Sequence, residues 1–310
     1  MTSTSHRHAA TPLLRQLVSL GLVAIIGVGW AGGYTLNRLA VDAGVPLLSV
    51  AFWQCLGPTV LLAPVLLVRR ASVPITPSFV RYYAIMGLFA VVLAYVAIIY
   101  AAPHVPVGVL SLEVTLEPAF TYAFALLLAM ERFHRLRFLG FVTGMAGLMV
   151  IVVPEAGLPS REMVPWVLLG LAAPISWAVF NVWLARTRPP KSDTVSLAFG
   201  MFAASSVLLI VPLAVTGEWW WFSGRFDQAD WAMLAAIVYN PIIWILAIEC
   251  IRLYGPVFYS TWGYVGTPAG LGFGMVAFGE SHSGWIYGAL VLLLVGLFLV
   301  NRTSSEARVV

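Results

Sequence analysis

Long apolar stretches alternate with short polar ones along almost the whole chain. Breaks at proline, glycine and clustered charges divide it into ten apolar segments. The length of each is close to that of a helix that crosses a bilayer, which is about 20 residues. These segments are residues 17–38, 46–68, 79–100, 105–129, 136–153, 164–185, 194–215, 231–251, 256–278 and 284–301. The pattern predicts an all-α membrane protein with ten transmembrane helices joined by short connections.

Composition supports this interpretation and excludes a soluble domain. The 310 residues are 61% hydrophobic and 10% charged, with a mean hydropathy of +0.93, whereas soluble domains are typically about 45–50% apolar and about 25% charged. The formal net charge of +4 does not indicate nucleic-acid binding, because the basic residues lie in short loops, where they set membrane topology. We therefore expect a lipid bilayer around the chain and no nucleic-acid partner.

The basic residues also predict an orientation. If the N-terminus is cytoplasmic, only Arg38, Arg161 and Arg225 lie outside, and the other 14 of the 17 basic residues lie inside, as the positive-inside rule requires. The first residues show no cleavable signal pattern. We expect a multi-pass plasma-membrane protein with cytoplasmic tails at 1–16 and 303–310.

The segment 105–129 carries two carboxylates, Glu113 and Glu117, inside an apolar run. Their spacing of four residues, continued by Thr121, predicts one shared helix face. Each charge costs about 2.5–3.5 kcal/mol at membrane depth, so we expect this face to line a polar cavity and to bind a substrate or a proton. Pro118 cannot donate a hydrogen bond to the carbonyl of Val114, so this carbonyl is left free beside the two carboxylates. The structural alternative is that each carboxylate pairs with a neighbouring hydroxyl or with Arg38.

The two halves of the chain repeat each other in a five-segment unit, residues 17–155 and 161–302. An odd number of spans inverts the second copy, so the sequence predicts two inverted five-helix repeats. That architecture is typical of secondary transporters, whose substrate site lies between the halves. The corresponding residues are Trp30 and Trp177, Pro106 and Pro256, and Pro118 and Pro268.

Three stretches resemble the drug/metabolite transporter superfamily, in its ten-span EamA-type branch. They are Trp30 near the start, A-M-E-R at Ala129–Arg132, and G-F-V-T-G-M-A-G at Gly140–Gly147. The run from Val105 to Pro118 is most similar to threonine/homoserine-type amino-acid exporters, with Gly108 and Glu113 on the motif's glycine and glutamate. The chain departs from the superfamily at Gly266–Pro268, where a carboxylate is often found. The resemblance implies a secondary transporter of the bacterial inner membrane.

Further polar and aromatic residues recur at helical spacing inside the segments. They could offer ring faces to a cation and amides to a carboxylate, or they could simply pack. With Glu113, Glu117 and Thr121, the candidate substrate- or proton-binding residues are Trp30, Tyr34, Trp177, Asn181, Asn240, Trp244, Tyr259 and Trp262.

Other site chemistries find little support. The five histidines show no metal-ligand spacing, and the two cysteines, Cys55 and Cys250, stand alone, so we expect no metal, cofactor or disulfide. No nucleotide-binding or hydrolase motif is present, which argues against direct ATP coupling and against a membrane enzyme. A receptor or scaffold usually carries an extramembrane domain, which the ten segments leave no room for.

The leading function is therefore a secondary transporter of small polar metabolites. We expect it to export amino acids by alternating access through a central cavity. The alternative is efflux of cationic drugs or amines by proton antiport.

Overall fold

The computed structural model describes residues 12–152, 160–190 and 192–302, and over these ranges the chain is helical, with no strand. The helices are α1 (Pro12–Asp42), α2 (Leu47–Arg69), α3 (Pro77–Met86), α4 (Leu93–Ala101), α5 (Val107–Glu113), α6 (Glu117–Leu127), α7 (Arg135–Val152), α8 (Val164–Gly170), α9 (Ala172–Thr187), α10 (Thr194–Thr216), α11 (Gln228–Tyr254), α12 (Pro256–Tyr259), α13 (Gly263–Phe278) and α14 (Gly284–Arg302).

Among the described residues, eight helical segments are long and apolar enough to cross a membrane. They are Leu17–Asp42, Leu47–Arg69, Pro77–Ala101, Val107–Leu127, Arg161–Leu184, Thr194–Thr216, Gln228–Tyr254 and Gly284–Asn301. The other two predicted spans, 136–153 and 256–278, coincide with α7 and with α12 and α13, but neither is among the eight. The predicted tails, and the boundary of the first repeat at residue 155, lie wholly or partly outside the described residues.

Helix ends follow from local chemistry. Asp193 and Asp227 each precede a helix and accept a hydrogen bond from the backbone N–H three residues on, which satisfies one free donor of the first turn. Gly217 ends α10 in the left-handed conformation, with φ 71°, a conformation that favours glycine. These signals place the boundaries of α10 and the start of α11 close to the predicted ones.

Within the described residues four of the predicted spans are interrupted: the sixth between α8 and α9, the ninth by the 3₁₀ turn Ser260–Trp262, and also the third and the fourth. The third changes from α3 through a π-helical stretch, Gly87–Val92, into α4, and the fourth changes from α5 through a 3₁₀ turn, Val114–Leu116, into α6. Because Pro118 has no backbone N–H, the α-helical hydrogen bond from residue 118 to the carbonyl of Val114 cannot form, and the helix is interrupted there.

A 3₁₀ turn separates Glu113 from Glu117 in the structure. Such a turn winds at about 3.0 residues per turn, against about 3.6 in an α-helix, so it changes the angle between the two side chains. Both carboxylates contact the sixth predicted span, residues 164–185: Glu113 lies against Gly170 at the end of α8, and Glu117 binds Asn181 of α9. That the two carboxylates share one helix face stays a prediction.

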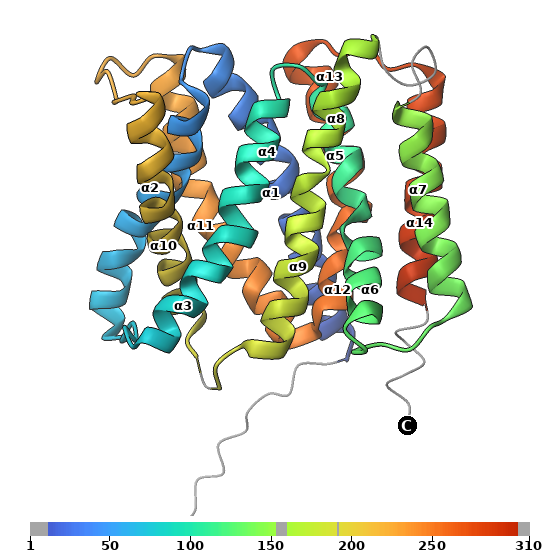
Figure 1. Cartoon of the computed structure of the whole chain (residues 1–310), viewed down its shortest axis with the longest axis horizontal. Coiled ribbons are helices and arrows are strands. Elements are labelled where there is room, and N and C mark those ends of the chain that lie inside the picture. The colour runs from blue at the N-terminus through green and yellow to red at the C-terminus, as the bar shows by residue number, and fades with distance from the viewer. Residues whose placement is uncertain (1–11, 153–159, 191, 303–310) are drawn as a thin grey trace, which may run out of the picture.

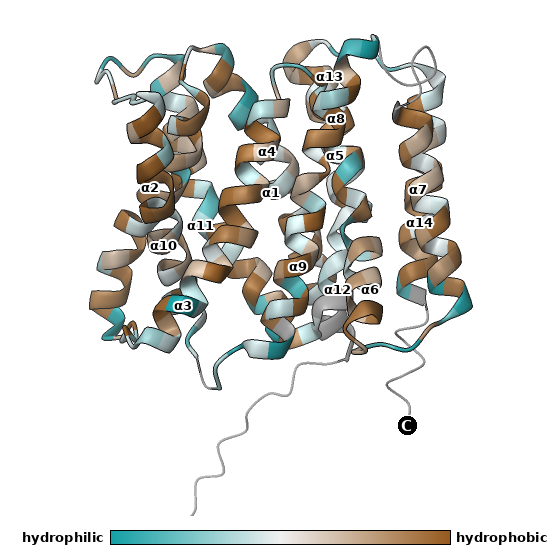
Figure 2. Cartoon of the chain, viewed as in Figure 1, coloured by the Kyte–Doolittle hydropathy of each residue, from teal (hydrophilic) through white to brown (hydrophobic). Residues whose placement is uncertain are grey.

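The helices form one bundle with α2, α3 and α10 on one flank and α7 and α14 on the other (Figure 1). In the middle, α1 packs against α11 and α13, while α5 packs against α13 and α6 against α9. Hydrophilic residues gather at the two ends of the bundle, and hydrophobic residues dominate between them (Figure 2). This arrangement gives the bundle an apolar girdle and a centre built from α1, α9, α11 and the interrupted fourth and ninth predicted spans.

Candidate functional site

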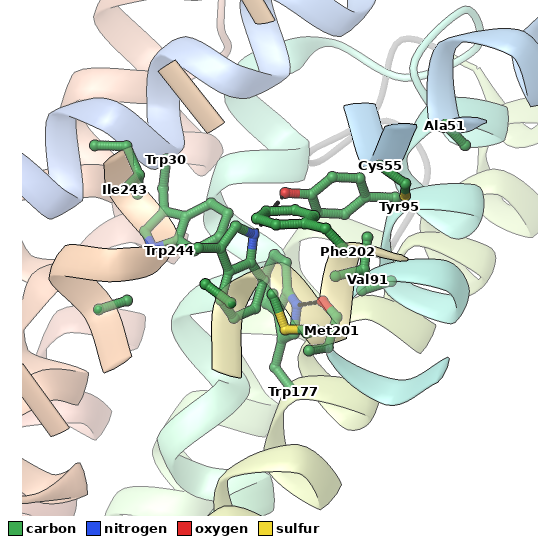
Figure 3. Packing of buried hydrophobic residues seen from close by; sticks show 14 of the residues in the cluster. Trp30, Ala51, Cys55, Val91, Tyr95, Trp177, Met201, Phe202, Ile243 and Trp244 are labelled. Carbon is green, nitrogen blue, oxygen red and sulfur yellow. Dashed lines mark hydrogen bonds between the residues drawn. The ribbon is translucent and has the colours of Figure 1, made fainter. Parts of the chain in front are cut away.

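Tryptophans from four elements meet at the centre of the bundle. Trp30 of α1 lies with its ring centroid 5.5 Å from Trp177 of α9, 5.1 Å from Trp244 of α11 and 6.3 Å from Trp262 of the 3₁₀ turn Ser260–Trp262. Figure 3 shows Trp30, Trp177 and Trp244 converging from their separate helices. The contact between Trp30 and Trp177 joins two residues that the sequence repeat predicts to correspond.

Hydrogen bonds fix the orientation of two of these rings. The indole N–H of Trp177 donates to the carbonyl of Ala90, at 2.8 Å, inside the π-helical stretch, where the widened winding leaves carbonyls free for side chains. The indole N–H of Trp244 donates to the Tyr95 hydroxyl, also at 2.8 Å (Figure 3). Both indoles therefore hold fixed positions rather than packing loosely.

Glu117 is the acidic group of this cluster. The amide of Asn181 donates to its Oε1 at 2.5 Å, and both side chains are buried, 2% and 5% exposed respectively. Buried charged or polar groups are stable only when they are hydrogen-bonded, and Asn181 supplies one such bond. One carboxylate oxygen is thus held by α9, beside the tryptophans.

A small central cavity lies among these side chains. The volume open to the centre of a water molecule is about 10 Å³, which is room for about one water. Any larger substrate can enter only if the helices separate. Its lining consists of Trp30, Glu117, Trp177, Phe180, Asn181, Trp244, Tyr259 and Trp262.

A second cavity of about the same volume, 10 Å³, shares Trp30 and Trp177 with the first. In this second cavity the amide of Gln54 donates to Asn37 Oδ1 at 2.7 Å. The lining is completed by Gly33, Tyr34, Asn37, Gln54, Tyr95, Ile98 and Tyr239. Trp30 and Trp177 therefore lie between the central cavity, which contains Glu117, and the second cavity, which is lined by amide and hydroxyl groups.

Glu113 lies outside both cavities. It is 1% exposed, and neither carboxyl oxygen has a hydrogen-bond partner among the described residues. A Cβ atom on Gly170 would stand 2.1 Å from Glu113 Oε2, so the carboxyl group fits only because residue 170 is glycine. The side chain of Leu110 lies at the same spot.

The structure thus brings together seven of the eleven predicted site residues: Trp30, Glu117, Trp177, Asn181, Trp244, Tyr259 and Trp262. Tyr34 lies in the second cavity. Thr121 donates to the backbone carbonyl of Glu117 at 2.8 Å, and Asn240 bridges the Tyr95 hydroxyl and the carbonyl of Gln54 at 2.6 and 3.0 Å. Neither Thr121 nor Asn240 lines a central cavity.

Seven lining residues are absent from the predicted site: Phe180 in the central cavity, and Gly33, Asn37, Gln54, Tyr95, Ile98 and Tyr239 in the second cavity. Gln54 gave a usable signal, since a buried amide within a membrane-spanning stretch is expensive unless it has a partner. Phe180 follows Trp177 by three residues, which places it on the same helix face. Tyr95 and Tyr239 gave no signal that separates them from other tyrosines near aromatic neighbours.

The arrangement suits a ligand with a positively charged group. The central cavity combines one carboxylate with the faces of tryptophan rings, which attract cations, and with an amide and a phenol that can bind polar groups. No lysine or arginine is among its lining residues. Within the described part of the chain, no group of three or more His, Cys, Asp or Glu side chains could hold a metal ion.

Comparison with known proteins identifies relatives among membrane transporters. The sequence profile of the EamA-like transporter family matches residues 17–153. A protein of Brucella anthropi named riboflavin transporter is 25% identical over 296 residues, covering 91% of this chain and 95% of its own length. The uncharacterized inner membrane transporter YedA of Escherichia coli K12 is 27% identical over 312 residues, covering 96% of this chain and 97% of its own. Both relatives are named as transporters and neither as an enzyme.

A solved crystal structure shares the fold. It is 21% identical, covers 92% of this chain and 98% of its own, and superposes with a TM-score of 0.58. At this identity the likeness concerns the arrangement of helices alone.

Proposed function

We propose that this chain, whose residues 17–153 match the EamA-like transporter family, is a multi-pass membrane transporter that exports small polar metabolites, with amino acids as the leading substrates. The relatives named above are called transporters, but they do not support the amino-acid exporter subtype. The substrate class therefore depends on the central cavity.

Glu117 is the observation on which this proposal depends. A buried carboxylate that is held by Asn181 and bordered by Trp30 can bind the ammonium group of a substrate by charge and by ring faces together. The hydroxyl of Tyr259 and the amide of Asn181 are available for the substrate's polar groups. We assign Glu117, Asn181 and the tryptophans to substrate binding.

We further propose alternating access between two inverted repeats, residues 17–155 and 161–302, with ten membrane crossings. In support, α7 packs along α14, and both the fourth and ninth predicted spans contain a 3₁₀ turn followed by a proline. The tryptophans Trp30 and Trp177 then meet where the two halves meet. A closed central cavity between two such halves is suited to open toward one side at a time.

Glu113 takes a different role in this scheme, as a site for proton exchange. An ionised carboxylate without a donor costs several kcal/mol in an apolar pocket. Loading and unloading a proton at Glu113 therefore changes the relative stability of conformations that expose this group to water and conformations that bury it. This scheme separates the proton site at Glu113 from the substrate site at Glu117.

A second candidate function is efflux of cationic drugs or amines. The observation that favours it is the lining itself, which holds aromatic faces and one carboxylate but no basic residue to bind an amino acid's carboxylate. The two candidates differ in whether zwitterions compete with simple cations.

Counterflow in proteoliposomes distinguishes the substrates. The purified protein is reconstituted into liposomes, and the liposomes are loaded with one unlabelled compound at a time. Uptake of the same compound in labelled form is then measured. The compounds tested are amino acids, choline, a lipophilic cation and riboflavin. We expect counterflow of amino acids. Counterflow of choline or the lipophilic cation alone would establish the second candidate, and counterflow of riboflavin alone would contradict both.

The Glu117→Gln variant tests the cavity. Losing the charge removes a charge-assisted contact of about 1.5–3 kcal/mol, so we expect the counterflow KM to rise about tenfold or more. Glu162→Gln is the matched control, because Glu162 is an exposed carboxylate in a turn outside the cavity. Equal kinetics in both variants would remove Glu117 from substrate binding.

The Glu113→Gln variant tests the proton site. Counterflow exchanges substrate for substrate and needs no net proton movement, so we expect it to continue in this variant. Transport driven by a pH gradient is expected to stop. Gradient-driven transport at the level of the unmodified protein would show that Glu113 exchanges no proton.

A further inference from the structure

An open cavity of about 670 Å³ lies at one end of the bundle, where α2 and α11 end and α10 begins. We call it the vestibule. Three arginines line it, Arg69, Arg188 and Arg252, against two carboxylates, Asp193 and Glu249. By the positive-inside rule this is the cytoplasmic end.

Two of the three arginines are paired. Arg69 Nη2 lies 3.4 Å from Asp193 Oδ1, and Arg252 Nε donates to Glu249 Oε2 at 2.9 Å. Glu249 also accepts a hydrogen bond from the Thr194 hydroxyl at 2.9 Å. Both carboxylates of the vestibule are therefore already engaged.

Arg188 has no carboxylate partner among the described residues. Its guanidinium donates only to neutral oxygens, those of Ser192 and Thr194, at 3.3–3.4 Å. Its Nη1 is buried and has no hydrogen-bond partner. Burial lowers the pKa of this guanidinium, and so does the nearby Arg252, whereas Tyr82 and Glu249 act in the opposite direction. The lining of the vestibule therefore holds three arginines against two carboxylates, and one of the guanidinium donors is buried without a hydrogen-bond partner, which is costly.

The vestibule adjoins the central cavity along two helices. Arg188 directly follows the end of α9 and lies seven residues after Asn181, which corresponds to about 10 Å along the helix axis. On α11, Ile245 lines the vestibule and its neighbour Trp244 lines the central cavity. A solute that moves from this end toward Glu117 therefore passes Arg188 first.

We propose that the vestibule is a binding site for an oxyanion, and that Arg188 binds the carboxylate or phosphate group of the transported metabolite before it reaches the central cavity. Arginine's planar fork suits such groups, because two parallel N–H donors match two oxygens. The proposal rests on the transport function proposed above and deepens it, because it requires a substrate with an anionic group. An amino acid meets this requirement through its carboxylate, whereas a simple cation does not.

Binding of inorganic phosphate tests the site without any transport. The purified full chain in neutral detergent is melted in sodium phosphate or in sodium chloride of equal ionic strength, since a ligand that prefers the folded state raises the melting temperature. We expect saturable stabilisation by phosphate. In Arg188→Gln the apparent Kd for phosphate is expected to rise about tenfold or more, and in Arg188→Lys it is expected to rise less.

Arg186→Gln is the matched control, because Arg186 is exposed on the same helix and does not line the vestibule. Phosphate binding in this variant is expected to equal that of the unmodified chain. Equal phosphate affinity in Arg188→Gln and Arg186→Gln, or no saturable stabilisation of the unmodified chain, would overturn the proposal. Because the readout is binding, its outcome is independent of whether counterflow occurs.

A lipid headgroup carries the same phosphate chemistry and needs its own arm of the test. The chain is reconstituted into vesicles of phosphatidylcholine alone or with phosphatidylglycerol. Under our proposal soluble phosphate stabilises the protein in both vesicles. Stabilisation by phosphatidylglycerol that depends on Arg188 and is not reproduced by phosphate would overturn the metabolite site and assign the vestibule to lipid.

Discussion

At the scale of single residues, two buried asparagines show how similar sequence signals lead to different roles. Asn181 and Asn240 both stand in apolar stretches, and the sequence predicts a cavity position for each. The structure places Asn181 in the central cavity on Glu117, whereas Asn240 ties α2 and α4 to α11 through Gln54 and Tyr95. The sequence identifies both as buried amides that need partners, but the partners are more than 60 residues away and depend on how the helices pack.

Alanine variants of the two asparagines are expected to separate these roles. Asn240→Ala leaves the Tyr95 hydroxyl and the Gln54 carbonyl short of a partner, at a cost of about 1–3 kcal/mol, so its melting temperature falls while its transport KM stays unchanged. Asn181→Ala is expected to raise KM. A changed KM in Asn240→Ala together with an unchanged KM in Asn181→Ala would contradict the position of the cavity.

At the scale of helices, each of the ten predicted segments overlaps a helical stretch of the described residues, and eight such stretches are long and apolar enough to cross a membrane. The pattern could not predict how the fourth span bends. Pro118 marked the weak point, but the direction of each carboxylate depends on the 3₁₀ turn and on the neighbours that receive it, Gly170 and Asn181. Close packing of helices is also set by small residues: a Cβ on Gly296 of α14 would lie 2.8 Å from the Gly140 carbonyl of α7.

Two glycines of α14 test that helix contact. Gly296→Ala forces α7 and α14 apart, and overpacking of this kind costs about 1–3 kcal/mol, so we expect a lower melting temperature. Gly288→Ala meets nothing within 4 Å and is expected to be neutral or stabilising, by up to about 1 kcal/mol, because alanine favours helix. Thermal unfolding of both variants in one detergent gives the comparison, and the same sign for both would contradict the close contact.

At the scale of the whole molecule, the central claim is that one closed site opens toward each side of the membrane in turn. The tryptophan cluster and Glu117 lie between elements from both halves of the chain, and their cavity is too small for a substrate. A large open cavity, the vestibule, adjoins this site along the same helices at the expected cytoplasmic end. Transport to the opposite side therefore requires the helices around Trp30 to part toward that side.

Labelling of a single cysteine at position 180 tests this claim most directly. Phe180 lines the central cavity without bonding Glu117, and Phe180→Cys is made after both natural cysteines, Cys55 and Cys250, are replaced by alanine. A membrane-impermeant thiol reagent is applied to right-side-out and to inside-out vesicles. We predict that it labels the cysteine in both, and that bound substrate slows both reactions. Labelling from one side only would contradict alternating access through this cavity.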